Sequence, residues 1–338
     1  MKKNVFAICD LETEYAVNFM EYLNRRKSLP FEIQAFTSVE TLTAYAEKNP
    51  VEILLISDRA MCREIQALKI GTVVILSEER PDPARKGFPA VYKYQAQDQL
   101  LREVMACYGE APDLTPLVSL AARRNTEILG VYSPLHRCLK TSIALTLGQI
   151  LAQDKAVLYL NLEEYSGFEG LMEKTYDSDL ADLIYYARQE DADLTKKMSA
   201  MIRTTGGLDY IPPVRTPWDL RCLTLRDCRR ILDSLVRCSA YEVILLDLGT
   251  EMEDILELLK LCSRIYMPVL TDPVSACKMR QFEQMVSAWD CEELWEKTVR
   301  LRPPYYASAG WGGSYVEQLA WGELASYLRK ALKLKPTA

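Results

Sequence analysis

Hydrophobic and polar positions follow two periods that alternate along the chain. Short runs rich in Val, Ile and Leu, such as Val51–Ser57, have the length and composition of buried strands. Between them, apolar residues recur every three or four positions, as Tyr15, Phe19 and Leu23 do within Glu14–Arg26, which predicts a helix. Strands that alternate with helices indicate a parallel sheet covered on both faces, so the sequence predicts an α/β protein.

The pattern divides into two doubly wound domains. Residues 1–110 form the first, residues 111–126 a turn-rich linker, and residues 127–338 the second. Strands are expected in the first domain at Val5–Cys9, Phe31–Phe36, Val51–Ser57, Thr72–Leu76 and Ala90–Tyr94, and helices at Glu14–Arg26, Val39–Lys48, Glu64–Lys69 and Gln97–Tyr108. Val118–Arg124 is a candidate short helix before the second domain.

The second domain repeats the alternation. Its strands are expected from Ile128 onward, then at Ala156–Leu160, Leu208–Ile211, Tyr241–Leu246, Arg264–Leu270 and Lys297–Leu301. Its helices are expected at Ser142–Ala152, Asp179–Gln189, Thr195–Ile202, Leu225–Cys238, Ile255–Cys262, Ser275–Ala288 and Tyr315–Leu332.

Polar side chains follow the strands of the first domain. They are Asp10, Glu12, Asp58, Ser77 and Lys93. The carboxyl ends of parallel strands build the site of an open α/β sheet, so these groups should gather at one edge. The set resembles that of a response-regulator receiver domain of flavodoxin-like fold. The resemblance implies that Asp58 accepts a phosphoryl group and that Asp10 lies in the acidic metal-binding pair.

Two features depart from the receiver pattern. Leu11 stands where a second acidic residue should adjoin Asp10, and the segment Glu78–Pro89 contains three prolines that leave little room for a fourth helix. We therefore favour an atypical receiver that serves as a docking module. A working phospho-switch, or carboxylates that only cap helix N-termini, remain as alternatives.

The stretch Ile128–Ser142 has the layout of a phosphate-binding loop, because an apolar strand and a loop lead to Lys140-Thr141 at the start of a helical run. In such a loop, backbone amides surround the phosphates, the Lys reaches the terminal phosphates and the hydroxyl meets Mg²⁺. The candidate residues for binding a nucleotide are Arg137, Cys138, Leu139, Lys140, Thr141, Ser142 and Asp247.

Asp247 follows the apolar run Tyr241–Leu246, a pattern typical of the Walker B carboxylate. Thr141 and Asp247 are the candidate ligands of Mg²⁺, the latter through water. ATP and Mg²⁺ are the expected cofactors, and a helix cap after a core strand is the alternative role for Asp247.

The second domain resembles the MinD/ParA-type P-loop ATPases. In their version of the loop, a second Lys lies five residues before the P-loop Lys, with glycines between them. Here those places hold Leu135, His136, Arg137 and Leu139, and Pro134 lacks an amide donor. A non-glycine residue in the left-handed conformation costs about 1–2 kcal/mol, so the loop should bind phosphates weakly.

The pairing of an atypical receiver with such a domain resembles the TadZ/CpaE proteins of Tad pilus assembly. That resemblance implies a cytoplasmic homodimer that marks a cell pole or the inner membrane surface and gathers pilus secretion components. Asn161 and Glu163 stand at the two places of the family's Asp-x-Asp switch, and Leu135 replaces its signature Lys. We therefore expect weak ATP binding and little or no hydrolysis.

Three other functions are compatible with these motifs. One is an active MinD/ParA-type ATPase whose ATP-dependent dimer cycle controls localisation. Another is a signalling protein phosphorylated on Asp58, and the most distant is DNA segregation. Titration with Mg-ATP tests for the active ATPase, and phosphorylation assays test for the signalling protein.

Composition narrows the choice further. The chain has 338 residues, of which 49% are hydrophobic and 26% charged, with a formal net charge of −6, which argues against a general nucleic-acid binder. The apolar runs are too short for a bilayer span or a signal peptide. Ten scattered cysteines and a single histidine, His136, argue against a zinc site and for free thiols in a reducing cytoplasm.

The C-terminal stretch Glu323–Lys335 is the remaining signal. It places Leu324, Leu328 and Leu332 on one face with basic residues around them. Such a helix could lie on a membrane. We favour a last helix packed on its own sheet, so membrane contact is expected to be indirect or peripheral.

Overall fold

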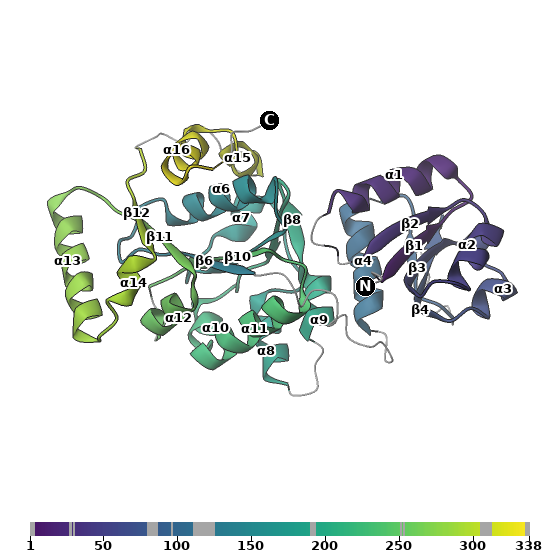
Figure 1. Ribbon diagram of the computed structural model, residues 1–338, viewed down its shortest axis with the longest axis horizontal. Coiled ribbons are helices and arrows are strands. Elements are labelled where there is room, and N and C mark those ends of the chain that lie inside the picture. Colours follow the sequence, from purple (N-terminus) through teal and green to yellow (C-terminus); the bar gives the residue numbers. More distant parts are fainter. Residues whose placement is uncertain are drawn as a thin grey trace. The chain divides into compact units, whose positions relative to one another are not determined.

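The computed structural model describes residues 4–26, 29, 31–79, 87–95, 97–110, 126–189, 194–250, 252, 254–304 and 313–334. The chain forms two compact units (Figure 1). Unit 1 consists of Met1–Arg123, Asp193–Met201 and Arg237–Ala240, and unit 2 is the remainder. The predicted helix at Val118–Arg124 lies outside the described residues.

Unit 1 is built on a five-stranded parallel sheet. Its strands are β1 (Val5–Cys9), β2 (Glu32–Phe36), β3 (Val51–Ser57), β4 (Ile70–Ser77) and β5 (Ala90–Tyr92). They lie in the order β2-β1-β3-β4-β5, which is the flavodoxin-like doubly wound order. The helices are α1 (Thr13–Asn24), α2 (Val39–Ala46), α3 (Arg63–Gln66), α4 (Gln97–Glu110), α9 (Leu194–Met201) and the 3₁₀ turn η1 (Asp58–Ala60).

The two faces of this sheet carry separate cores because successive side chains of a strand point to opposite faces. On β1, Phe6 and Ile8 join the core beneath Phe19 and Leu23 of α1, while Val5, Ala7 and Cys9 join the other. The sheet is therefore buried on both sides, and its strand ends are the places left for polar groups.

Unit 2 is built on a seven-stranded sheet. Its strands are β6 (Glu127–Val131), β7 (Val157–Leu162), β8 (Arg203–Thr205), β9 (Leu208–Ile211), β10 (Val243–Leu248), β11 (Arg264–Pro268) and β12 (Thr298–Leu301). They lie in the order β12-β11-β6-β10-β7-β9-β8, all parallel except the edge strand β8, which is antiparallel to β9. The predicted α/β class with parallel sheets is confirmed.

Helices cover both faces of this sheet (Figure 1). On one face lie α6 (Lys140–Ala152), α7 (Phe168–Met172), α15 (Gly313–Leu319) and α16 (Glu323–Leu332); on the other lie α8 (Leu180–Arg188), α10 (Pro217–Arg221), α11 (Leu225–Cys238) and α12 (Ile255–Leu261). Helices α13 (Pro273–Ala288) and α14 (Glu293–Glu296) flank β11 and β12.

Helix α6 is the central helix of unit 2, with every residue from Ile143 to Ile150 buried. Gly148 lets it approach the sheet, because a Cβ there would lie 2.7 Å from the Leu208 side chain. On its outer side, the Gln149 amide donates a hydrogen bond to the carbonyl of Val316 in α15. The helix is thus held between the sheet and α15.

The structure corrects several predicted boundaries. The single helix expected over Tyr315–Leu332 is two helices, because the backbone leaves the helical conformation at Gly322. Strand β10 continues to Leu248, so Asp247 lies within the strand and not in a helix cap after it. Helices α7 and α10 and strand β8 were not predicted, although Thr216-Pro217 at the start of α10 is a recognisable N-terminal signal.

The leucine face of α16 packs on unit 2. Leu324 and Leu328 belong to its main core, and Leu332 packs against it. Among the described residues, no helix has the length and apolar character that crossing a membrane requires.

Candidate functional site

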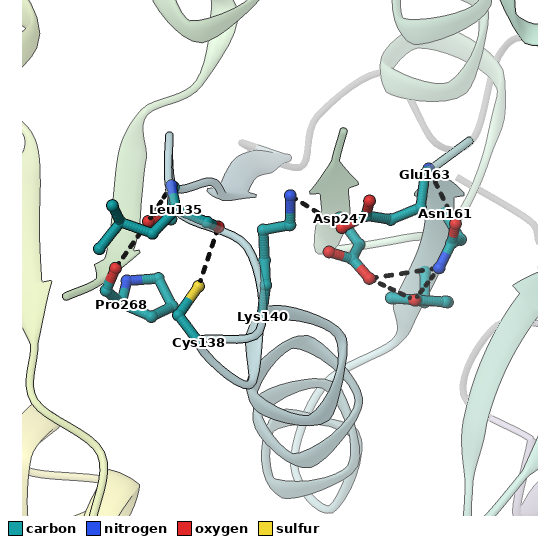
Figure 2. Close-up of polar contacts among 9 residues, drawn as sticks. Leu135, Cys138, Lys140, Asn161, Glu163, Asp247 and Pro268 are labelled. Atoms are coloured by element: carbon teal, nitrogen blue, oxygen red, sulfur yellow. Dashed lines mark hydrogen bonds and ion pairs between the residues drawn. The ribbon is translucent and has the colours of Figure 1, made fainter. Parts of the chain in front are cut away.

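The loop between β6 and α6 is fixed at its start by buried hydrogen bonds (Figure 2). The Ser133 hydroxyl donates to the carbonyl of Pro268 at 2.8 Å and accepts from the Leu135 amide at 3.2 Å. The Cys138 thiol donates to the Leu135 carbonyl at 3.3 Å. Leu135, at the place of the signature Lys, is 2% exposed, so its side chain belongs to the core and not to a surface.

Two loop residues adopt the left-handed conformation. Arg137 has φ of 57° and Leu139 has φ of 64°, and both occupy places where the resembled family has glycine. The loop therefore makes two left-handed bends without glycine, at a cost of about 1–2 kcal/mol for each residue. Leu139 offsets part of this cost by packing against the core, whereas Arg137 is exposed.

Helix α6 begins directly after this turn with Lys140, and its N-cap residue, Leu139, provides no side-chain cap. The first amides of the helix therefore face the loop, an arrangement suited to an anion. The loop residues Leu135–Ser142 and Glu163 line a pocket of about 440 Å³. That volume lies within the range of small-molecule sites.

The ammonium group of Lys140 is already paired. It lies 2.8 Å from a carboxylate oxygen of Glu163, with the two side chains 8% and 19% exposed. The amide of Glu163 donates to the Asn161 side-chain oxygen at 2.9 Å, which fixes the backbone beside the pocket. A phosphate group that approaches Lys140 must displace or share this carboxylate.

Asp247 lies behind this pair, fully buried. Its Oδ2 accepts hydrogen bonds from the Tyr159 hydroxyl at 2.9 Å and the Asn161 amide at 3.2 Å (Figure 2). Its Oδ1 has no hydrogen-bond partner within the described chain. Burial, and next the charge of Glu163, raise the pKa of Asp247 to about 7, although Lys140 and the Thr141 hydroxyl act in the opposite direction.

A buried carboxylate oxygen without a hydrogen-bond partner, beside the Lys140–Glu163 pair, fits a cation brought in with a ligand. Thr141 and Asp247 are the residues that would hold Mg²⁺. Across the described residues, no group of three or more His, Cys, Asp or Glu side chains could hold a metal ion. Magnesium would thus depend on phosphate oxygens for the rest of its ligands.

The remaining predicted nucleotide residues have structural roles. The Ser142 hydroxyl is hydrogen-bonded to the Tyr315 hydroxyl of α15 at 2.9 Å. Burial raises the pKa of the Cys138 thiol, which makes it a poor nucleophile. Tyr159 was missed by the sequence argument; its spacing of two from Asn161 on one strand places both side chains on the same face, a signal that could have found it.

Some of the polar residues predicted at the strand ends of unit 1 lie close together. Lys93 is fully buried, and its ammonium group lies 2.8 Å from Asp10 and 3.1 Å from Glu12. Burial alone would lower the pKa of Lys93, but pairing with these two carboxylates raises it. The Lys93 amide donates to the carbonyl of Ser77 at 2.8 Å, so Ser77 lies beside this cluster. Asp58 is exposed at the start of η1, directly after β3.

The sequence matches no protein-family model and no curated protein. Solved structures are similar to part of the chain. A ParA family ATPase from Chlorobium tepidum is 16% identical, with a TM-score of 0.44, over 63% of this chain and 94% of that chain. A plasmid partition protein from Borrelia burgdorferi bound to AMPPNP is 13% identical, with a TM-score of 0.41, over 62% and 97%.

A variant of the Cyanothece protein McdA in complex with ATP is likewise 13% identical, with a TM-score of 0.44, over 64% of this chain and 99% of that chain. At TM-scores this low the likenesses carry no argument about function. The case for a function therefore rests on the residues of this chain.

The backbone strain at Arg137 can be measured by comparing two truncations. Arg137→Gly is expected to be more stable than Arg137→Ala by about 1 kcal/mol, because only glycine adopts the left-handed conformation without cost. Both variants remove the same exposed side chain, so the comparison isolates the backbone. Urea unfolding measures the difference, and equal stabilities would show that position 137 is not strained.

The buried carboxylate of Asp247 should make stability depend on pH. Its pKa is raised on folding, from 3.8 to about 7, so the folded state retains a proton that the unfolded state releases, and this group's contribution falls as pH rises through that window. Asp247→Asn is therefore expected to stabilise the protein by about 2–4 kcal/mol at about pH 8, and by less at about pH 5.

Thermal or urea unfolding at the two pH values measures this gain. Asp254→Asn is the matched control, since that carboxylate is exposed and makes no side-chain cap bond. A gain for Asp247→Asn that is the same at both pH values would contradict the prediction.

Proposed function

We propose that the protein is a TadZ/CpaE-like localisation and assembly scaffold for a Tad-type pilus secretion system. In this proposal, unit 2 is a degenerate MinD/ParA-type ATPase that dimerises and recruits partners, with weak or no ATP hydrolysis. The observation that carries the proposal is the Lys140–Glu163 ion pair within a loop that keeps its phosphate-binding turn.

The energetics support weak nucleotide binding. A charge-assisted hydrogen bond contributes about 1.5–3 kcal/mol, and about 1.4 kcal/mol changes affinity tenfold. A terminal phosphate must displace Glu163 from Lys140 or share the ammonium group with it, so the bond it gains is offset by the one that is lost or by repulsion from the carboxylate. ATP would be held by the loop amides, Lys140 and Thr141, and Mg²⁺ by Thr141 and Asp247. Bound Mg²⁺ would neutralise charge on the phosphates.

The burial of Leu135 supports a dimer that does not depend on ATP. A side chain that is 2% exposed and apolar has no means of contacting a phosphate bound by a second copy. The proposed homodimer therefore forms through protein surfaces. The protein would act in the cytoplasm at the cell pole or the inner membrane surface, held there by pilus components, and the burial of the α16 leucines supports membrane contact that is indirect.

Unit 1 is proposed to be an atypical receiver-like docking module. Its doubly wound strand order and the Lys93–Asp10–Glu12 cluster at the strand ends support this assignment. The same cluster favours a second candidate function, signalling by phosphorylation of Asp58. Against it, Mg²⁺ would have to compete with a fully buried Lys93 for both acidic side chains.

The scaffold proposal is tested by measuring dimerisation and nucleotide turnover on the same samples. Sedimentation equilibrium without nucleotide is expected to show a dimer for the wild type. Phosphate release from Mg-ATP is expected to be at background. A dimer that forms only with ATP, together with phosphate release that Lys140→Ala abolishes, would establish the active ATPase instead.

Phosphorylation of Asp58 is tested with beryllofluoride and Mg²⁺, which mimic an aspartyl phosphate. We expect the amide NMR signals of unit 1 to remain unchanged, because Lys93 already occupies the acidic pair. Asp58→Asn is the control. Signals that shift in the wild type and not in the variant would favour the signalling function.

A further inference from the structure

The Glu163 carboxylate is paired with Lys140, the residue that in a phosphate-binding loop reaches the β- and γ-phosphates. We propose that the pocket consequently accepts a nucleoside diphosphate in preference to a nucleoside triphosphate, and that Glu163 is the residue that sets this preference. The inference rests on the proposed nucleotide site and names the ligand class that the site takes.

The Glu163 carboxylate lies within hydrogen-bond distance of the Lys140 ammonium group. In a phosphate-binding loop, the loop amides surround the α- and β-phosphates and the Lys reaches the β- and γ-phosphates, so the γ-phosphate is the one that depends on the Lys without the amides. Glu163 Oε1 lies 2.8 Å from Lys140 Nζ, the distance of a charge-assisted hydrogen bond to a phosphate oxygen. Figure 2 shows the two side chains directed toward each other beside the loop. Glu163 also lines the same pocket as the loop.

The surroundings hold Glu163 in this position. Its amide is bound to the side chain of Asn161, which is 1% exposed and itself bonded to Tyr159 and Asp247. The backbone of Glu163 thus belongs to a buried hydrogen-bonded network that fixes its position. Moving the carboxylate away would leave Lys140, 8% exposed, without this partner.

The charges separate the two ligands. A third phosphate would add negative charge beside the Glu163 carboxylate, so the triphosphate has to overcome repulsion in a partly buried site. A diphosphate places its charge on the loop amides and the uncapped start of α6, where the helix dipole favours an anion. The preference for the diphosphate then comes from repulsion between the Glu163 carboxylate and the additional phosphate of the triphosphate.

Titration calorimetry with ADP and with ATP, each in excess Mg²⁺, tests the proposal on the full chain. We expect the wild type to bind ADP more tightly than ATP by about tenfold or more. Glu163→Gln keeps the shape and removes the charge, so the two affinities should come within about threefold, mainly through a gain for ATP. Lys140→Ala is expected to weaken both.

Glu169→Gln is the matched control, since that half-exposed carboxylate lies outside the pocket lining; its ADP to ATP ratio should equal that of the wild type. Circular dichroism checks that each variant is folded. If the Glu163→Gln variant does not fold, Glu163→Asp is used in its place. Its shorter side chain withdraws from Lys140, so this variant should also reduce the preference for ADP.

Three results would overturn the inference: ATP binding as tight as ADP binding in the wild type, a ratio that Glu163 variants leave unchanged, or no binding of either nucleotide. Sedimentation of the same samples without nucleotide reports separately on the scaffold proposal. A protein that dimerises without nucleotide and shows no preference for ADP would contradict this inference alone. A monomeric protein that prefers ADP would contradict only the scaffold proposal.

Discussion

In unit 2, the pairing of the buried Lys140 ammonium group determines how the loop before α6 can bind a ligand. A charge that is 8% exposed must be paired, and the chain pairs it with its own Glu163. Removing one partner of a buried ion pair leaves the other uncompensated, at a cost of about 3–5 kcal/mol. A change at either residue therefore affects stability as well as any ligand chemistry, and the amide of Glu163 connects the pair to the side chain of Asn161 and through it to Asp247.

The geometry of the loop follows from its anchors. Strained backbone persists only where the surrounding structure imposes it. Here Ser133 ties the start of the loop to β11, Leu135 is buried, and α6 is fixed along most of its length. Between these fixed points, Arg137 and Leu139 adopt positive φ without glycine. The fold thus imposes a turn that the local sequence does not favour.

The sequence predicted the alternation of strands and helices well, because that alternation reflects the local periodicity of apolar residues. Val51–Ser57 and Leu208–Ile211 have the predicted bounds, and Lys140 and Thr141 lie at the start of a helix as expected. The break at Gly322 was missed, although the five-residue interval from Leu319 to Leu324 departs from the helical spacing of three or four.

The pairing of Lys140 with Glu163 could not be read from the sequence, because it depends on β7 and β6 lying on either side of β10. The burial of Leu135 depends in the same way on the contact of Ser133 with Pro268, residues from distant parts of the chain. The sequence predicted where the loop lies along the chain but not which of its residues contact other parts of the chain.

Helix α6 links the pocket to the C-terminal part of unit 2. Its first turn is bonded to α15 through Ser142 and Tyr315, and two turns later Gln149 is bonded to Val316. These two bonds attach neighbouring residues of α15 to two points on α6 that lie about two turns apart. Any displacement of α6 would therefore act on α15 at both points, which couples the position of α15 to the loop at the start of α6.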